Sequence, residues 1–157
     1  MGGKVNIEKI ANDGRIAFGL LLSNWMLRSE WSQVQLQELS RVCVGFATVH
    51  PTQLSRMRKV IDGKETTWAP GVMFFKSIAL ANLAVDRYQR EKVLPDYAEL
   101  YGDGKFRNAK LALDEVLRTG IVVRHADGEI LDDVDFWAIY AGTQQPPAGW
   151  GTKTDVH

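Results

Sequence analysis

Polar and basic side chains alternate with apolar ones in residues 50–64. Leu54, Met57 and Ile61 follow helical spacing and predict a helix over 51–61. With this apolar stripe turned inward, the rest of the helix presents side chains that hydrogen-bond to bases and phosphates: Thr52, Gln53, Ser55, Arg56, Arg58 and Lys59. Arginine pairs with guanine, glutamine with adenine, and lysine with the phosphate backbone. Because an α-helix fits the major groove of B-DNA, the pattern favours a helix that reads double-stranded DNA.

Two residues at the ends of this segment, His50 and Lys64, extend the same chemistry. The segment 50–64 holds four Lys or Arg residues and one acid, Asp62, so its charge suits a polyanionic partner. Two plainer interpretations stay open. A solvated helix face carries the same charges, and His50 before Pro51 fits an N-terminal cap or a surface residue.

Other kinds of site lack their motifs in this chain. The single cysteine, Cys43, excludes an internal disulfide and a multi-cysteine zinc site, and we expect it to be a small buried core group. The three histidines stand in no catalytic arrangement, and the turn at 102–105 lacks the phosphate-loop pattern. The acidic cluster in 127–135 lacks the spacing of a calcium loop. We therefore expect no enzyme, no metal site and no cofactor.

Helices in the first half of the chain must position the basic segment. The predicted helices cover about 15–28, 33–42, 51–61 and 70–92. Ser32 is expected to cap the second helix, and Gly63 to end the third in the left-handed conformation. The fourth helix is apolar on two faces, so we expect it to be buried in the core or at a subunit contact.

The second half of the chain predicts a smaller α+β region over 96–142. The expected elements are a helix that begins near Phe106, a β-hairpin that turns at Asp127-Gly128, and a short helix that begins at Asp132 or Asp133. We expect the last helix to bury Val134 and Trp137. Three other aromatic residues are expected to be packing groups: Trp25, Trp31 and Trp68.

Length and composition predict one compact domain with a small C-terminal appendage. The chain has 157 residues, of which 45% are hydrophobic and 24% charged. The predicted division is a flexible lead-in (1–14), a helical head (15–92), the α+β region (96–142) and a disordered tail (143–157). The formal net charge is zero, but residues 1–85 carry a net +4 and the remainder a net −4. No apolar run is long enough to span a bilayer, and we expect a cytoplasmic protein with no membrane partner.

Two motifs give the first half a resemblance to a known family. Trp31-Ser32-Gln33-Val34-Gln35-Leu36 stands at the second predicted helix, and Thr52-Gln53-Leu54-Ser55-Arg56-Met57 is followed by Gly63-Lys64. Over about residues 15–85, the chain resembles the lambda-repressor-like (Xre-type) helix-turn-helix family. The linking segment around 41–49 is several residues longer than the usual turn of that motif.

The resemblance implies a lambda-repressor-like helix-turn-helix bundle in the first half. The expected fold is therefore mainly α, a helix-turn-helix bundle with a small α+β C-terminal appendage that contains the one β-hairpin. The resemblance implies that Gln33 lies near a phosphate or an outer base. It also implies that Thr52, Gln53 and Arg56 face the groove, and that the cations nearer the DNA backbone are Arg58, Lys59 and Lys64.

The expected function is a sequence-specific transcription regulator that binds double-stranded DNA as a homodimer. The alternative is a protein–protein interaction module, an adaptor or antitoxin-like partner, that keeps the helical fold without binding DNA.

Overall fold

A computed structural model describes the backbone of residues 2–64, 68–99 and 109–152, and the side chains of 14–64, 68–99 and 113–152. Within these residues the secondary structure is helical apart from one isolated β-bridge. The helices are α1 (Gly2–Ser29), α2 (Gln33–Val44), α3 (Pro51–Ile61), α4 (Val72–Glu91), α5 (Ala109–Thr119) and α6 (Asp133–Ala141). The mainly α prediction is therefore confirmed.

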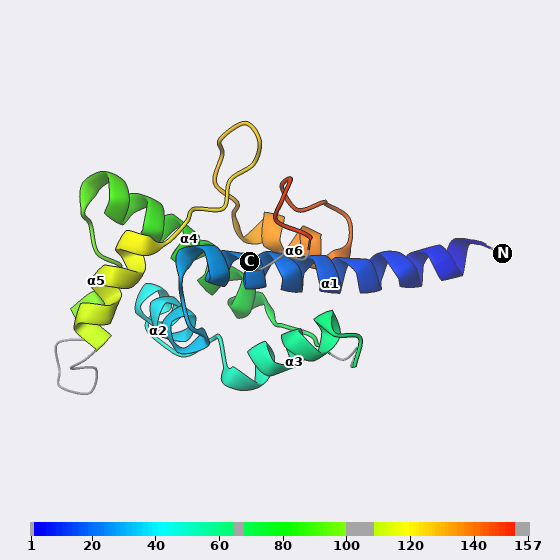
Figure 1. Cartoon of the computed structure of the whole chain (residues 1–157), viewed down its shortest axis with the longest axis horizontal. Helices are drawn as coiled ribbons and strands as arrows, with labels where there is room; N and C mark the ends of the chain where they lie inside the picture. Colours follow the sequence, from blue (N-terminus) through cyan, green and yellow to red (C-terminus); the bar gives the residue numbers. More distant parts are fainter. Residues whose placement is uncertain (1, 65–67, 100–108, 153–157) are drawn as a thin grey trace.

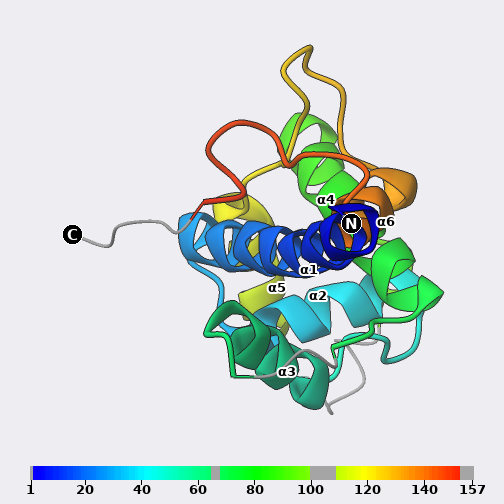
Figure 2. The ribbon, with the colours of Figure 1, turned by 90° about the vertical axis from the view of Figure 1, so that its right-hand side faces the viewer.

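Helix α1 is the central element, and the other helices gather around its second half (Figure 1). Helices α6 and α3 both pack on α1, and Figure 2 shows α3 along one edge of the molecule. The backbone is helical from Gly2, which differs from the flexible lead-in expected for 1–14. The predicted inner face of α1 is confirmed, because its four stripe residues are fully buried: Phe18, Leu21, Leu22 and Trp25.

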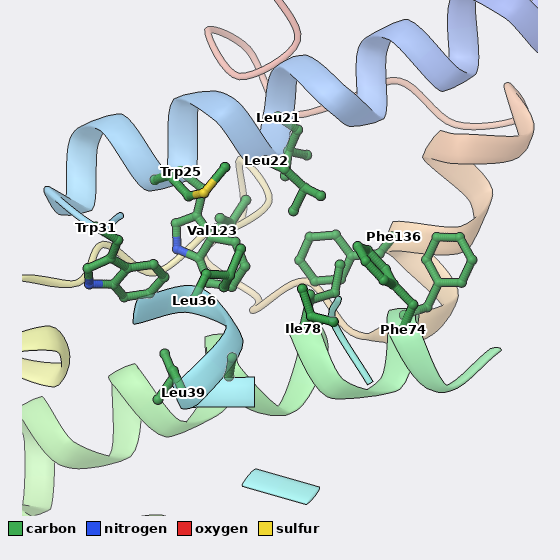
Figure 3. Close-up of a cluster of buried hydrophobic side chains, with 14 of the residues drawn as sticks. Leu21, Leu22, Trp25, Trp31, Leu36, Leu39, Phe74, Ile78, Val123 and Phe136 are labelled. Carbon is green, nitrogen blue, oxygen red and sulfur yellow. The ribbon is translucent and has the colours of Figure 1, made fainter. Parts of the chain in front are cut away.

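A single hydrophobic cluster draws side chains from α1 to α6 (Figure 3). Trp25 and Trp31 lie at one end, where their indole N–H groups donate to the carbonyl oxygens of Ile121 (2.7 Å) and Val116 (2.9 Å). Trp68 stacks on Phe18 with ring centroids 5.4 Å apart. All three tryptophans are buried as predicted, and the C-terminal region shares the core of the helical head.

Helix α2 begins and ends at residues that satisfy its terminal backbone groups. Ser32 caps it as predicted: its hydroxyl accepts from the Gln35 amide, and the Gln35 side chain accepts from the Ser32 amide. Gly45 ends the helix with φ at +97°. A Cβ on Gly45 would lie 2.9 Å from the Tyr97 ring, so glycine is required there for its conformation and for the close approach.

Helix α3 lies against α1 through its apolar side. Leu54, Met57 and Val60 are buried, and Ile61 from the predicted stripe is half-buried. A Cβ on Gly19 of α1 would lie about 3.0 Å from the Ile61 side chain, so the glycine lets α3 approach α1 closely. The chain leaves α3 through a left-handed Gly63, as expected.

Helix α4 uses one side for the core and leaves the other exposed. The buried side includes Phe74 and Ile78 together with three polar residues, Ser77, Asn82 and Asp86. The Asn82 amide accepts from the Val123 amide (2.8 Å) and donates to the carbonyl oxygens of Val123 (3.0 Å) and Leu131 (3.3 Å). A buried polar side chain with its hydrogen bonds satisfied fixes the packing of the chain that it contacts.

The predicted β-hairpin is not supported. Residues 121–131 form an excursion that projects on the side away from α3, with one isolated bridge between Arg124 and Ile130 (Figures 1 and 2). Two backbone hydrogen bonds flank this bridge, from His125 to Glu129 and from Leu131 to Val123. The Val123 amide donates to the Asn82 side chain and not to the opposite segment, so the β-ladder ends at Val123.

Helix α6 begins where the sequence predicted, but it buries a different side. Asp132 is its N-cap and forms a capping box with Asp135. Phe136 and Ile139 are buried, whereas the residues expected inside, Val134 and Trp137, are 64% and 52% exposed. The expectation for these two side chains was wrong. The nine residues of α6 are apolar on most sides, so spacing alone did not identify the inner face.

Residues 143–152, expected to be a disordered tail, pack across α1. The Asn24 amide donates to the carbonyl oxygens of Trp150 (2.8 Å) and Thr152 (2.9 Å). The Arg28 guanidinium lies 4.2 Å from the centre of the Trp150 ring and donates to the Gly149 carbonyl. These contacts place the described part of the tail against the rest of the domain, and residues 153–157 of the expected tail lie outside the described residues.

Candidate nucleic-acid interface

Four residues on one side of α3 form a continuous exposed surface, which we call the α3 outer face: Thr52, Ser55, Arg56 and Lys59. Their spacing of three, four and seven residues places them on one side of the helix, opposite the buried Leu54 and Met57. Figures 1 and 2 show α3 at the edge of the molecule, with no other described helix beyond it. The sequence therefore placed these side chains on the solvent side.

Three further polar residues border the α3 outer face. Arg58 and Lys64 are exposed, and so is His50 at the N-cap of α3. The His50 side chain makes no capping hydrogen bond, so the imidazole does not satisfy the first turn. Pro51 occupies the first helical position, where its missing N–H removes no helical hydrogen bond. The sole acid between residues 50 and 64 is Asp62, at the far end of α3.

Gln33 and Arg58 connect the start of α2 to the second half of α3. With its amide oxygen turned toward the guanidinium, Gln33 accepts from Arg58 Nε at 3.0 Å and from a terminal nitrogen at 3.2 Å. Both partners are polar groups at the surface side of the two helices. The pair orients Arg58 and brings Gln33 to the same surface as the α3 cations.

Gln53 differs from its neighbours on α3. Its side chain is half-buried, and its amide oxygen is buried without a hydrogen-bond partner among the described residues. The sequence expected Gln53 to face the DNA groove with Thr52 and Arg56. Its position four residues before the buried Met57 and seven before the buried Val60 places Gln53 at the edge of the inner side of the helix. Fewer polar side chains of α3 are therefore exposed than the sequence predicted.

The link between α2 and α3 comprises the six residues 45–50, longer than the usual three- to four-residue turn. Tyr97 fixes the start of the link. The Tyr97 ring packs on Gly45, the first residue of the link, and the Tyr97 amide donates to the Val42 carbonyl (2.9 Å). Val49 is buried, whereas Phe46 is 52% exposed. The link is thus anchored at both ends and sets how α3 follows α2.

Other titratable groups serve the fold. Burial raises the pKa of the Cys43 thiol to about 12, helped by the nearby Asp96 carboxylate, so Cys43 stays protonated inside the core. In the acidic segment, Asp132 caps α6, and the Asp127 side chain accepts from the Glu129 amide. No group of three His, Cys, Asp or Glu side chains in the described parts of the chain is arranged to hold a metal ion.

A second surface, on α4, was not predicted. A groove of about 400 Å³ runs between the exposed side of α4 and residues 130–133. Its walls are apolar, with Leu80 and Leu83 from α4 facing Ile130 and Leu131. The signal in the sequence was the second apolar face of α4, which left a subunit contact open as one of two explanations.

Residues 8–142 match the sequence profile of a family described as "Domain of unknown function (DUF8644)". The chain belongs to this family. The DUF8644 match covers most of α1 and continues through α6, so it includes both the helical head and the region of the excursion. No curated protein and no solved structure matches the chain. None of the described helices is both long and apolar enough to cross a membrane.

Proposed function

We propose that this DUF8644 domain binds double-stranded DNA in a sequence-specific way and regulates transcription, with α3 entering the major groove. The observation that carries the proposal is the α3 outer face, a solvent-exposed helix side with hydroxyl groups and cations and no acid. An α-helix and its side chains fit the major groove, where Arg and hydroxyl groups distinguish bases. Both views place α3 at the edge of the molecule, with no other described helix beyond it.

The exposed residues divide into two roles by their chemistry. Arg56 is central on the α3 outer face and is the residue that we assign to a guanine edge. Lys59 and Lys64 lie near it and neutralise phosphates, and His50 at the N-cap of α3 hydrogen-bonds to a phosphate oxygen. Arg58 is held by Gln33, so the pair contacts the backbone as a preformed unit. Gln53 contributes to the flank of α3 and not to base reading, because its amide oxygen is buried.

Selection of bound duplexes from a random pool tests this assignment. We expect the wild-type chain to enrich one sequence motif. Arg56→Ala should relax the preference at one base position and weaken binding to the selected site by about 1–3 kcal/mol. Lys59→Ala should weaken binding equally to selected and unselected duplexes, because a phosphate contact carries no base information.

The matched control removes two exposed cations far from α3. Lys92→Asn keeps a residue that tolerates the left-handed conformation at that position (φ +58°), and Arg118→Ala lies on α5. This double variant should bind DNA as the wild type does. Failure to enrich any motif, or equal losses for Arg56→Ala and the control, would contradict the proposal.

A second candidate function is the protein–protein interaction module. The exposed apolar side of α4 favours it, because such surfaces mark binding sites for other proteins. The variant Arg56→Ala with Arg58→Ala separates the two candidates. Unchanged retention of this variant on a DNA column would exclude DNA reading by α3, and loss of a bound protein partner in Leu80→Glu with Leu83→Glu would support the interaction module.

A further inference from the structure

The exposed side of α4 has the spacing of a helix-pairing surface. Its residues repeat at intervals of three and four, and we call them the α4 ridge: Met73, Lys76, Leu80, Leu83 and Arg87. Alternation of three and four residues is the seam of paired helices, with apolar side chains toward the centre. Here the two central residues are leucines and the outer charged residues are cations. Leu80 is 42% exposed and Met73 is 39% exposed.

Apolar troughs lie on both sides of the α4 ridge. The groove of about 400 Å³ separates it from Ile130 and Leu131. On the other side, the chain turns back after α4, and Val93 and Leu94 line a smaller hollow next to Leu83. Val93 and Leu94 are 47% and 45% exposed. A ridge between two troughs is the shape that accepts another helix by ridges-into-grooves packing.

We propose that the α4 ridge is a dimer interface and that its occupant is a second copy of this chain, with the two α4 helices antiparallel. A two-fold axis between Leu80 and Leu83 places Leu80 of each copy opposite Leu83 of the other, and Lys76 opposite Arg87. Leu80 and Leu83 of each copy then pack into the groove of the other copy and also line the groove of their own copy. Each α4 helix is 20 residues long, about 30 Å, enough for the whole ridge to take part.

Charge complementarity identifies the second copy as the occupant. The groove ends at Asp132 and Asp133, and the smaller hollow is lined by Asp96. In the antiparallel pair, Arg87 of one copy approaches Asp133 of the other, and Lys76 approaches the other copy's Asp96. None of these four side chains has an ion-pair partner among the described residues. Opposite charges at each end fix the antiparallel orientation and offset the repulsion between facing cations.

The proposal stands independently of DNA binding. The groove lies at the base of the 121–131 excursion, and both ribbon views place this excursion on the side of the molecule opposite α3. A second copy on the α4 ridge therefore leaves the α3 outer face uncovered. Oligomeric state measured without DNA tests the dimer alone.

Sedimentation velocity of the full chain over a wide range of concentrations is the first test. We expect a monomer–dimer equilibrium for the wild type. Leu80→Glu with Leu83→Glu should raise the dimer Kd by about 100-fold, because each buried central anchor contributes about tenfold or more. Leu27→Glu, which alters an apolar residue of α1 that is 47% exposed, is the matched control and should leave the Kd unchanged. Circular dichroism establishes that each variant is folded.

Charge reversal tests the orientation. Arg87→Glu and Asp133→Lys should each weaken the dimer, and the two substitutions together should restore it. Mixing Leu80→Cys chains with Leu83→Cys chains and adding a short bis-maleimide should yield crosslinked dimers. Wild-type chains should not crosslink, because Cys43 is buried and protonated.

The proposal would be overturned by a monomer at every concentration, by a dimer unaffected by the Leu80 and Leu83 substitutions, or by charge reversals that do not compensate. A stable complex with a different protein through the α4 ridge, with no self-association, would also overturn it.

Discussion

The α3 outer face and the α4 ridge are both exposed sides of amphipathic helices, but they expose opposite chemistry. The α3 outer face holds hydroxyl groups and cations, whereas the α4 ridge has two leucines at its centre, with Lys76 and Arg87 on either side of them. Helix α3 buries one apolar stripe against α1 and α2, and its polar side is left for solvent. Helix α4 buries one apolar side and still has apolar residues outside. The two helices therefore expose two chemically different surfaces.

The two regions are also held in place differently. Buried polar groups fasten the wall of the α4 groove: Asn82 bonds the backbone at Val123 and Leu131, and Asp86 accepts from Arg124 (2.6 Å). Helix α3 is held by apolar packing and by polar contacts at the start of α2. Buried polar networks lose much stability when one partner is removed, whereas exposed polar contacts lose little. Substitutions in the two regions should therefore differ in size.

Asn82→Leu should have the largest effect. It removes three buried hydrogen bonds and leaves the backbone groups of Val123 and Leu131 without them. Each buried group left unpaired costs about 1–3 kcal/mol, and we expect a loss of about 4 kcal/mol in the free energy of unfolding. Urea denaturation measures it. A loss below about 1 kcal/mol would show that Asn82 does not fasten the excursion to α4.

Asp86→Asn should have the second-largest effect and should depend on pH. Burial raises the pKa of Asp86, but hydrogen bonds and charge from Arg90 and Arg124 outweigh it, so the pKa lies below its usual value. A carboxylate with a lowered pKa stabilises the folded state above its unfolded pKa, near 3.9, and the contribution disappears as pH falls through the folded pKa.

We therefore expect Asp86→Asn to cost about 2 kcal/mol at pH 7, because both arginines are partly exposed and screened. The difference from wild type should shrink in strong acid, below about pH 4. Denaturation curves at several pH values give this difference. A constant difference at all pH values would contradict the account of Asp86.

Ser32→Ala should have a moderate effect, confined to the α3 side. It removes the hydroxyl that accepts from the Gln35 amide at the start of α2. Loss of an N-cap costs about 1 kcal/mol, which thermal denaturation can measure. Ser32→Asn is the control and should keep most of the stability, because asparagine is an equally good N-cap. Equal losses for both variants would show that the cap is not the cause.

Gln33→Ala should change stability least. Its contact with Arg58 lies at the surface, so we expect less than about 0.5 kcal/mol in the free energy of unfolding. DNA affinity should nevertheless fall, because Arg58 loses the partner that orients it. Fluorescence anisotropy with a labelled duplex measures this loss. If the affinity is unchanged, the pair has no part in the interface.

Local patterns predicted the α3 outer face well. The spacing of Leu54 and Met57, the cap at Ser32 and the left-handed Gly63 all depend on residues within two or three turns, and the structure confirms them. The exposure of Arg56 and Lys59 follows from the same spacing. Most of what positions the proposed interface is thus encoded locally.

Contacts between distant residues explain what the sequence did not predict. The β-hairpin fails because Asn82, some 40 residues away, takes the backbone amide of Val123. The tail is placed by Asn24 and Arg28 from α1, at separations beyond 120 residues. Periodicity carries no information on such pairs. The α4 groove was missed for the same reason, since one wall comes from α4 and the other from residues 130–133.

The salt dependence of DNA binding tests the central claim most directly. We would measure the affinity for the selected duplex by fluorescence anisotropy at several salt concentrations, for the wild type and for Arg56→Ala with Lys59→Ala. Each phosphate-contacting cation removed should reduce the slope of log affinity against log salt by about one, so the double variant, which loses the phosphate contact of Lys59, should lose about one. Lys92→Asn with Arg118→Ala should keep the wild-type slope. Identical slopes for all three proteins would contradict the assignment of the α3 outer face to DNA.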